Sequence, residues 1–469
     1  MGVKKGEIVE LEISEMAFGG MGLARKDGFV IFVDKTAPLD NVSAQIIKKK
    51  KNHAIARLVS IIEPSPLRVK PICAYSGHCG GCKWQFLNYE KQLEYKRQHV
   101  IESIEHIGLI HDFTVHPTIP SKLIFGYRNK MEFSCSDRRW LLPDELGKED
   151  VDKGIALGLH VPGTFYKVLD IDRCHLQPDM GNDILNDVRM FIKKSGVDVY
   201  GLRTHKGFWR FLMLRYSFAY NQWMVNIITS EENRKIVQPL SDLLAKKYPD
   251  IVSVINNITS RKSGVAIGEY EIVLMGAPCI REKIGDFEFE ISANSFFQTN
   301  TLGAEKLYET VKNYAGLTGK EIVADLYCGT GAIAIYLSDS AKKVIGIEIN
   351  ESSVKDANFN CEINNVTNCS FILGDIKDSL KNITDRLDVM IIDPPRVGMH
   401  KDVIGQVFDL CPEKLIYVSC NPATMARDLA MLKEKYDLIE VQPVDMFPHT
   451  SHIEAVARLE KKGYVNKII

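Results

Sequence analysis

Long apolar runs are missing from this 469-residue sequence. No stretch approaches the ~20 consecutive apolar residues of a membrane-spanning helix, which argues against an integral membrane protein. The first residues also lack the apolar segment of a signal peptide, so we expect a cytoplasmic protein. Neither sign of charge dominates overall, because 59 Lys and Arg oppose 60 Asp and Glu. Repeats and low-complexity tracts are absent, so the composition is that of an ordinary globular protein.

The 11 cysteines are odd in number and scattered along the chain. Without a secretory signal they argue against a disulfide framework and favour metal-binding or catalytic thiols. Three of them, Cys73, Cys79 and Cys82, crowd into one glycine-rich segment, which favours a metal site. Spacing alone leaves both zinc and a [4Fe–4S] cluster open. It also leaves four candidates for a fourth ligand, namely Cys135, Cys174, His78 and His175.

The first 62 residues read as a succession of short strands. Residues 7–13 alternate apolar and polar side chains, and residues 28–33, 44–47 and 54–59 are rich in β-formers. So many strands in so short a span predict a small OB-type β-barrel, a shape often used on RNA. The first 130 residues carry 19 Lys and Arg against 13 Asp and Glu, including the run 48–51. Such an excess attracts a phosphate backbone, although the run could also be a solvated loop.

The rest of the chain divides at about residue 293. Residues 63–292 open with prolines and the cysteine segment, continue with a charged helix at 89–107, and predict an α+β middle domain. From residue 293 to 469, strands and helices alternate regularly. That pattern predicts a Rossmann-like α/β domain with a doubly wound, mainly parallel sheet.

A glycine-rich turn follows the apolar strand at 321–325. It reads Asp325-Leu-Tyr-Cys-Gly-Thr-Gly331, and Glu348 ends the next strand 23 residues after Asp325. In an open α/β sheet this is where a nucleoside ligand binds, with the acidic residue on its ribose. Spacing alone does not exclude a dinucleotide. The carboxylate of Asp325 favours a ligand with an ammonium group, and Asp375, after a later strand, is placed near an adenine.

Two further strand ends carry reactive side chains. Asp393 is followed by two prolines and Arg396, which form a stiff corner at the sheet edge. Cys420 follows the apolar strand 415–419. A thiolate there could add to C6 of a pyrimidine and activate C5, although a buried core cysteine reads the same way. Glu454 lies among apolar residues, where a carboxylate becomes either a base with a raised pKa or a solvated strand residue.

Together these motifs resemble the RNA uridine-5 methyltransferases, in particular the type that carries a TRAM domain and an iron–sulfur cluster. The resemblance covers nearly the whole chain and rests on residues 325–331, 393–396, 418–422 and 452–454. It implies that Cys420 is the nucleophile and Glu454 the base, and that the target base is flipped out of its stack. It also implies a TRAM domain at residues 1–62, S-adenosylmethionine as methyl donor and a [4Fe–4S] cluster.

The resemblance assigns the remaining site residues one by one. Phe296 would lie beside the flipped base, and Gln298 would contact substrate or cofactor. The cofactor positions are Tyr327, Glu348, Asp375 and Asp393, and the cluster ligands are Cys73, Cys79, Cys82 and Cys174.

The substrate implied by the TRAM-plus-cluster arrangement is 23S ribosomal RNA, at an unpaired or remodelled loop, and we expect a monomer. The alternatives are a transfer RNA uridine-5 methyltransferase, a cytosine-5 enzyme and a non-enzymatic iron–sulfur RNA-binding protein. Arg396 stands where RNA cytosine enzymes commonly place a cysteine, which argues against a cytosine-5 enzyme.

Overall fold

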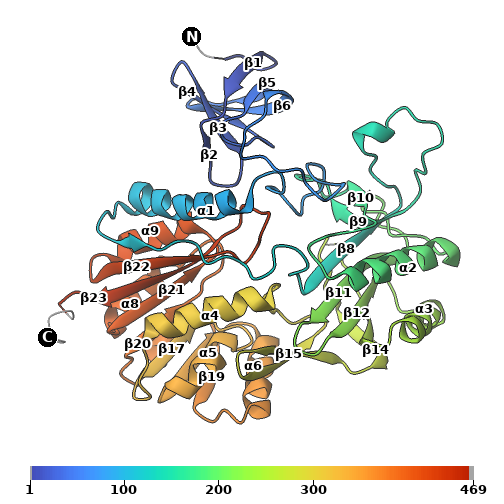
Figure 1. The fold of residues 1–469 in the computed structure, drawn as a ribbon. Coiled ribbons are helices and arrows are strands. Elements are labelled where there is room, and N and C mark those ends of the chain that lie inside the picture. Colours follow the sequence, from blue (N-terminus) through green and yellow to red (C-terminus); the bar gives the residue numbers. More distant parts are fainter. Residues whose placement is uncertain (1–2, 263, 464–469) are drawn as a thin grey trace.

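The part of the chain that the structure describes folds around three separate β-sheets and one hairpin (Figure 1). The computed structural model describes residues 3–262 and 264–463. The outer ends of the first and last predicted domains therefore lie outside the described residues. No helix in this part of the chain is long and apolar enough to cross a membrane.

The N-terminal sheet has six strands in the order β1-β5-β6-β4-β3-β2. They are β1 (Ile8–Glu12), β2 (Glu15–Met16), β3 (Gly22–Lys26), β4 (Phe29–Val33), β5 (Asn41–Lys49) and β6 (His53–Glu63). Buried and exposed residues alternate along β1, β5 and the first half of β6, as the period-2 pattern predicts. One face of the sheet therefore encloses a small apolar core of its own, which includes Ile13, Ile31, Val42 and Ile46.

The middle sheet has seven strands in the order β10-β9-β8-β11-β12-β13-β14. They are β8 (Lys130–Ser136), β9 (Ala156–His160), β10 (Val168–Asp170), β11 (Trp209–Ser217), β12 (Gln222–Thr229), β13 (Ile251–Ile258) and β14 (Tyr270–Gly276). Helices α2 (Asp179–Ser195) and α3 (Arg234–Lys247) bury their apolar stripes in the same core. The hairpin β15 (Cys279–Ile284) and β16 (Phe287–Ser292) follows, and its side chains join the core of the C-terminal sheet instead.

The C-terminal sheet has eight strands in the order β19-β18-β17-β20-β21-β23-β22-β7. Five are parallel: β17 (Ile322–Leu326), β18 (Lys343–Glu348), β19 (Cys369–Leu373), β20 (Val389–Ile392) and β21 (Lys414–Ser419). The strands β22 (Tyr436–Val444) and β23 (Glu454–Lys461) form an antiparallel pair beside β21. The helices are α4 (Thr301–Ala315), α5 (Ala332–Leu337), α6 (Glu351–Ile363), α7 (Ile376–Ser379), α8 (Lys401–Leu410) and α9 (Pro422–Leu432).

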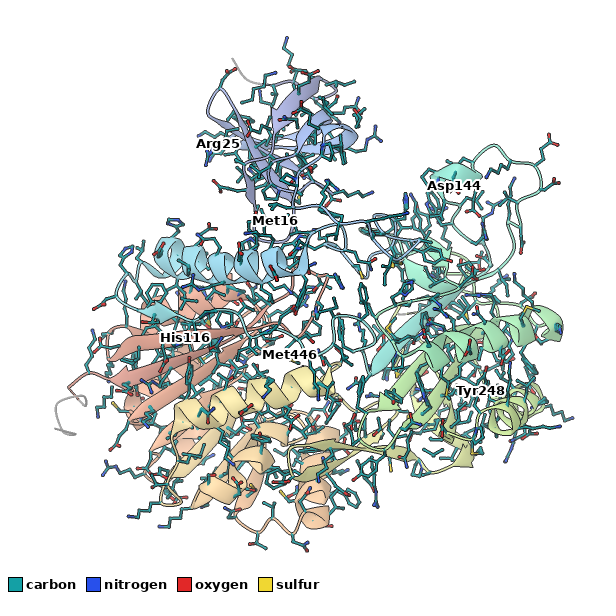
Figure 2. All side chains as sticks on the ribbon, in the orientation of Figure 1. Met16, Arg25, His116, Asp144, Tyr248 and Met446 are labelled. Carbon is teal, nitrogen blue, oxygen red and sulfur yellow. The ribbon has the colours of Figure 1, made fainter. Side chains whose placement is uncertain are left out.

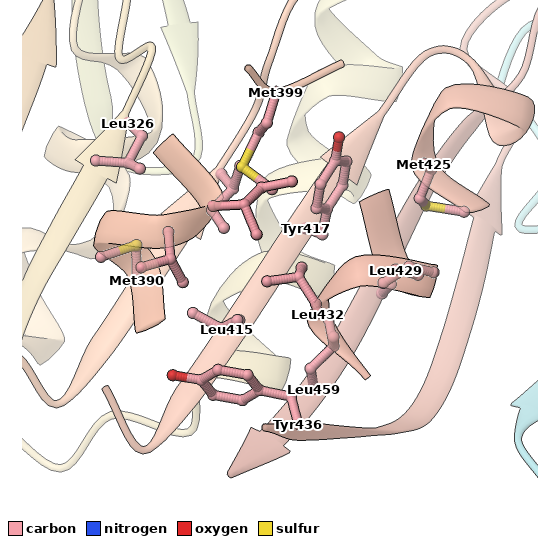
Figure 3. Close-up of a cluster of buried hydrophobic side chains, with 14 of the residues drawn as sticks. Leu326, Met390, Met399, Leu415, Tyr417, Met425, Leu429, Leu432, Tyr436 and Leu459 are labelled. Atoms are coloured by element: carbon pink, nitrogen blue, oxygen red, sulfur yellow. The ribbon is translucent and has the colours of Figure 1, made fainter. Parts of the chain in front are cut away.

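An apolar core lies on each face of this sheet. One contains Leu326, Met390, Tyr417 and Leu429, which Figure 3 shows in close-up. The other packs α4, α5 and the hairpin. The predicted fold class is confirmed: a doubly wound, mainly parallel α/β domain follows an N-terminal β domain and an α+β middle domain.

One N-terminal segment packs on the C-terminal sheet. It comprises helix α1 (Tyr89–Ser103), the short π-helix η1 (Ile104–Gly108) and strand β7 (Thr114–Val115), which pairs with β22. Val100 and Ile104 belong to the same core as α9, and Figure 1 shows α1 beside that helix. Met16 of β2 lies above α1 (Figure 2). Its carbonyl accepts a hydrogen bond of 2.7 Å from His99 Nε2 of that helix. The residues of α1, η1 and β7 belong to the predicted middle domain in sequence, but they pack on the C-terminal sheet.

Candidate active site

Cys420 and Glu454 come together because two neighbouring strands run in opposite directions. Ser419, the last residue of β21, pairs with Ala455 of β23. Cys420 and Glu454 therefore directly adjoin the last pair of this ladder, one after its strand and the other at the start of its strand. Glu454 is buried, whereas Cys420 is half-buried. The nucleophile and base expected from the sequence thus face the same end of the sheet.

Asp393 and Arg396 lie at the same end. Asp393 follows β20, whose last residue, Ile392, pairs with Tyr417 of β21. The carbonyl of Arg396 accepts hydrogen bonds from Asn421 Nδ2 and Thr424 Oγ1, both 3.2 Å long. These bonds fix the corner after the two prolines against the turn that carries Cys420. The corner therefore presents a carboxylate and a guanidinium to the thiol.

Burial and like charges shape the protonation of these groups. Burial raises the pKa of the Cys420 thiol, the charge of Glu454 raises it further, and Arg396 lowers it. Burial and the charge of Asp393 raise the pKa of Glu454 well above its ordinary value. Burial also raises the pKa of Asp393 to about 7. Two acids with raised pKa values thus lie near a thiol.

Three of the predicted cofactor residues line one cavity of about 310 Å³, whereas Gln298 and Asp393 do not line it. Tyr327, Glu348 and Asp375 all contribute to its wall. The Glu348 carboxylate accepts the backbone N–H of Gly329 (3.1 Å), which ties the glycine turn to the end of β18. Gly329 has a φ of +54°, and a Cβ added there would meet nothing within 4 Å. The turn therefore leaves open space above its backbone for a ligand to approach closely.

Asp325 is fully buried beneath this turn. Neither carboxylate oxygen has a hydrogen-bond partner within the described ranges of the chain. Burial and the charge of Asp393 raise the pKa of Asp325 well above its ordinary value, and the nearby backbone N–H of Ala334 offsets only part of this effect. A buried acceptor without a partner is costly, so this one fits a ligand that brings a positively charged donor.

The segment carrying Phe296 and Gln298 is clamped by the middle domain. Arg215 of β11 donates to the carbonyl of Ala293 (3.2 Å), and Asn129 Nδ2 donates to the carbonyl of Gln298 (2.8 Å). Phe296 is 66% exposed, and Gln298 is half-buried. An aromatic side chain this exposed, on a fixed backbone, is available to a substrate. Among the described residues, no hydrogen bond joins the side chain of Gln298 to Cys420.

Of the loop between β22 and β23, residues 445–453, the sequence indicated only the last two residues, as part of the 452–454 motif. Lys96 Nζ lies 2.6 Å from Asp445 Oδ1, and both side chains are fully buried. Tyr89 donates to the other oxygen of Asp445 (2.9 Å), while Gln92 Oε1 accepts the backbone N–H of His449 (2.9 Å). Helix α1 therefore holds the loop that ends at Glu454. In the sequence, the residues of α1 indicate only a charged helix and give no sign of this contact.

Tyr308 of α4 was also missed. It is buried, and its pKa is raised by burial and by the charges of Asp393, Asp325 and Glu454. A tyrosine at a buried position of an amphipathic helix looks like a core residue, so the sequence carried no signal of its place among three acids.

The four predicted cysteine ligands line a second cavity, of about 230 Å³. Gly81 N–H lies 3.3 Å from Cys79 Sγ, and Gln85 Nε2 lies 3.5 Å from Cys82 Sγ. Of the candidate fourth ligands, Cys174 and His175 line this cavity, whereas Cys135 lies in the apolar core. Within residues 3–262 and 264–463, no three His, Cys, Asp or Glu side chains are arranged to hold a single metal ion.

Comparisons with known proteins identify relatives of this chain. A family model described as tRNA (Uracil-5-)-methyltransferase matches residues 230–462, and a TRAM domain model matches residues 2–59. An uncharacterized RNA methyltransferase of Chlorobaculum tepidum is 43% identical and aligns over 98% of this chain and 97% of its own length. One of Bacteroides thetaiotaomicron is 42% identical over 95% of this chain and all of its own length.

A solved structure extends the likeness to three dimensions. It is the Pyrococcus abyssi tRNA (uracil-54, C5)-methyltransferase in complex with S-adenosyl-L-homocysteine. The TM-score is 0.76 at 30% identity, over 96% of this chain and 100% of that one. The chain therefore belongs to the tRNA (uracil-5-)-methyltransferase family, and it is a methyltransferase that uses S-adenosylmethionine.

Proposed function

We propose that this enzyme methylates carbon 5 of a uridine in RNA through a covalent adduct on Cys420. The thiolate adds to C6 and its electron pair moves through the ring to make C5 nucleophilic. C5 then takes the methyl group, Glu454 removes the C5 proton, and the electrons of that C–H bond restore the ring as the C6–S bond breaks. The observation that supports the proposal is the pairing of Ser419 with Ala455, because Cys420 and Glu454 directly adjoin this pair and the charge of Glu454 acts on the thiol.

The raised pKa of Glu454 suits the last step. A carboxylate in a buried site is a stronger base than one in water, so it accepts a carbon-bound proton more readily once the substrate is attached. The Cys420 thiol needs a lowered pKa instead, since only the thiolate attacks. Arg396 supplies it, because its charge lowers the pKa of Cys420.

The residues near the glycine turn fit S-adenosylmethionine, whose sulfonium supplies the methyl group when it is bound. Asp325 offers an unpartnered buried carboxylate to an ammonium group. The cavity lined by Tyr327, Glu348 and Asp375 would take the nucleoside part. Asp393 lies between this cavity and Cys420 in strand order, and Phe296 and Gln298 would contact the flipped base. These residue roles are part of the proposal.

For the cysteine cavity we propose a [4Fe–4S] cluster held by Cys73, Cys79, Cys82 and Cys174. An all-thiol donor set suits it, and each thiolate in such a cluster binds a different iron. The thiols would then surround a volume, and the four cysteines line a cavity of about 230 Å³. We assign the cluster a structural role.

Anaerobic purification tests the cluster. Wild-type protein should be brown and contain iron and sulfide, whereas Cys174→Ser should lose most of both. Cys279→Ser is the control, because Cys279 lies on the β15–β16 hairpin outside the cavity. A colourless wild-type protein with one zinc ion per chain would reject the assignment.

The proposed substrate is 23S ribosomal RNA. The support is the resemblance of the TRAM-plus-cysteine arrangement to large-subunit ribosomal RNA enzymes. Transfer RNA is a second candidate, because the structural relative from Pyrococcus abyssi is named for uracil 54 of tRNA. We propose that the enzyme acts as a monomer, which sedimentation analysis would test.

Tritium release tests function and substrate together. Wild type, Cys420→Ala, Glu454→Gln and the control Cys279→Ser are incubated with S-adenosylmethionine and RNA carrying tritium at uracil C5. We expect release from unmodified 23S rRNA by wild type and control only, and a denaturation-stable protein–RNA adduct with Glu454→Gln. Release from tRNA but not rRNA would keep the mechanism and change the substrate. Methyl transfer without tritium release would reject carbon 5 as the target.

A further inference from the structure

A groove of about 1250 Å³ lies between the N-terminal barrel and the middle sheet. One wall comes from β5 and β6, including Ile47, Arg57 and Ile61. The opposite wall comes from the segment after β8, residues 138–146, and the cysteine-rich segment contributes residues 76–83. Neither the methyl-transfer site nor the cofactor cavity shares a lining residue with this groove.

The groove has a strong excess of positive charge. Seven Lys and Arg side chains line it, against the single acidic residue Asp34. Arg68 pairs with Asp40 and Arg139 pairs with Glu145. The other five form no ion pair within the described chain: Lys35, Arg57, Lys83, Arg138 and Lys153. Unneutralised cations that line one groove attract a polyanion.

Apolar and aromatic surface lies among these cations. Trp140 is 43% exposed, and its backbone N–H donates to the carbonyl of Val168 (2.7 Å), which fixes its position. Lys167, which does not line the groove, has its Nζ 3.9 Å from the Trp140 ring centroid. Ile47 and Ile61 are 46% and 37% exposed on the opposite wall. Flat apolar surface between cations suits unpaired bases, whose faces are open for stacking, better than a duplex, which presents phosphates and sugars.

The groove leads toward the catalytic loop. Lys83 lines it, and the backbone N–H groups of Lys83 and Trp84 both donate to the carbonyl of His449 (2.8 and 2.9 Å). Gly20, beside the groove residue Met21, lies so close to this loop that an added Cβ would stand 2.9 Å from Ser451 Cβ. A strand of RNA in the groove would therefore pass next to the loop that ends at Glu454.

We propose that this groove binds a single-stranded RNA segment flanking the target uridine, with one unpaired base stacked on Trp140. Phosphates of that segment lie near Arg57 and Arg138. The proposal deepens the proposed function, because it takes the methylated RNA as the occupant. Its test uses binding rather than methyl transfer, so the two can fail separately.

Fluorescein-labelled oligo(U) RNA is the probe, because stacking tolerates any base and oligo(U) stays single-stranded. We expect Trp140→Ala to weaken its binding to the full-length protein roughly tenfold, whereas Trp140→Phe retains most of the affinity. Phe165→Ala is the matched control. Phe165 is 69% exposed in the nearby β9–β10 loop but does not line the groove, so its removal should leave oligo(U) affinity unchanged.

Salt dependence tests the charged part of the groove. Arg57→Gln with Arg138→Gln should lower the slope of log Kd against log salt by about 1.4, since each single-strand phosphate contact contributes ~0.7. S-adenosylhomocysteine affinity serves as the folding check for every variant. Unchanged oligo(U) affinity in Trp140→Ala would overturn the proposal, as would equal affinity for a blunt RNA duplex. If Trp140→Ala weakens binding while wild type methylates no uridine, the groove stands and the proposed function falls.

Discussion

At the residue scale, neighbouring groups shift the pKa of the Cys420 thiol in opposite directions. Burial and Glu454 hold the pKa of Cys420 above its ordinary value, and Arg396 is the cation that acts against them. In the proposed mechanism only the thiolate attacks C6, and the charge of Arg396 lowers the pKa of that thiol. This makes Arg396 a residue whose loss should change a pH profile, not only a rate.

We expect Arg396→Gln to shift the rise of kcat/KM with pH to higher pH. Without the guanidinium the pKa of the Cys420 thiol rises, so less thiolate is present near neutrality. An opposite charge at close range changes a pKa by one unit or more, so activity at pH 7.5 should fall roughly tenfold and recover partly at pH 9. Tritium release across pH measures this. The control is Arg386→Gln, a surface residue paired with Glu413. An equal loss at every pH would contradict the prediction.

Asp325 should make the ligand-free protein less stable at neutral than at acid pH. Its folded-state pKa is raised above the unfolded value of about 3.8. The stability contributed by its protonation is therefore fully present below that value and is lost as pH rises toward the folded pKa. We expect Asp325→Asn to raise the Tm at pH 7.5 by roughly 2–4 °C, and by less at pH 5.5, while weakening S-adenosylhomocysteine binding. Calorimetry measures both, and a lower Tm for the variant would refute this account.

At the scale of elements, one helix from the N-terminal part holds the loop that ends at Glu454, the proposed base. Helix α1 reaches residues 445–453 through Lys96, Tyr89 and Gln92. Both side chains of the Lys96–Asp445 pair are fully buried, so each charge is compensated by the other and not by water. The position of Glu454 therefore depends on a helix more than 300 residues away in sequence.

We expect Lys96→Met to lower the free energy of unfolding by about 3–5 kcal/mol, because it leaves the Asp445 charge buried and unpaired. Adding Asp445→Asn should restore part of this stability but not kcat, since the loop still lacks its anchor. Urea denaturation and methyl-transfer kinetics measure the two effects. The control Lys306→Met removes an exposed pair with Glu309 and should cost less than about 1 kcal/mol. Full kcat in the double variant would show that the anchor does not position the base.

At the scale of the whole molecule, the C-terminal domain is not built from C-terminal residues alone. Strand β7 covers the edge of β22, and Val100 and Ile104 complete the core around α9. The N-terminal part of the chain thus supplies both an edge strand and a packing helix to the methyltransferase sheet. Removing them would expose an unpaired edge and apolar surface.

A fragment that begins at residue 279 should therefore aggregate when expressed alone, although it retains Cys420, Glu454 and the cofactor turn. Co-expression with residues 64–128 should restore solubility, because that segment contains α1, η1 and β7. Solubility and near-ultraviolet circular dichroism check this. A soluble, cooperatively unfolding fragment without its partner segment would contradict the expectation.

The sequence by itself determined the local elements and the chemical types of the site residues. Alternating apolar residues predicted the barrel strands, and the strand–turn–helix pattern predicted the cofactor turn at residues 325–331. The reason is that period-2 and period-3.6 patterns, glycine turns and strand ends are set by near neighbours along the chain. The resemblance of four motifs to one family then supplied roles for Cys420 and Glu454 that spacing alone left open.

Only the tertiary structure decided which distant residues meet. The antiparallel insertion of β23 beside β21 set Glu454 next to Cys420, and the packing of α1 brought Lys96 to Asp445. The groove beside Trp140 likewise exists only because the barrel and the middle sheet face each other. These contacts depend on how whole elements bury their apolar faces against one another, and a buried ion pair or a charged groove leaves no periodic signal in the residues that form it.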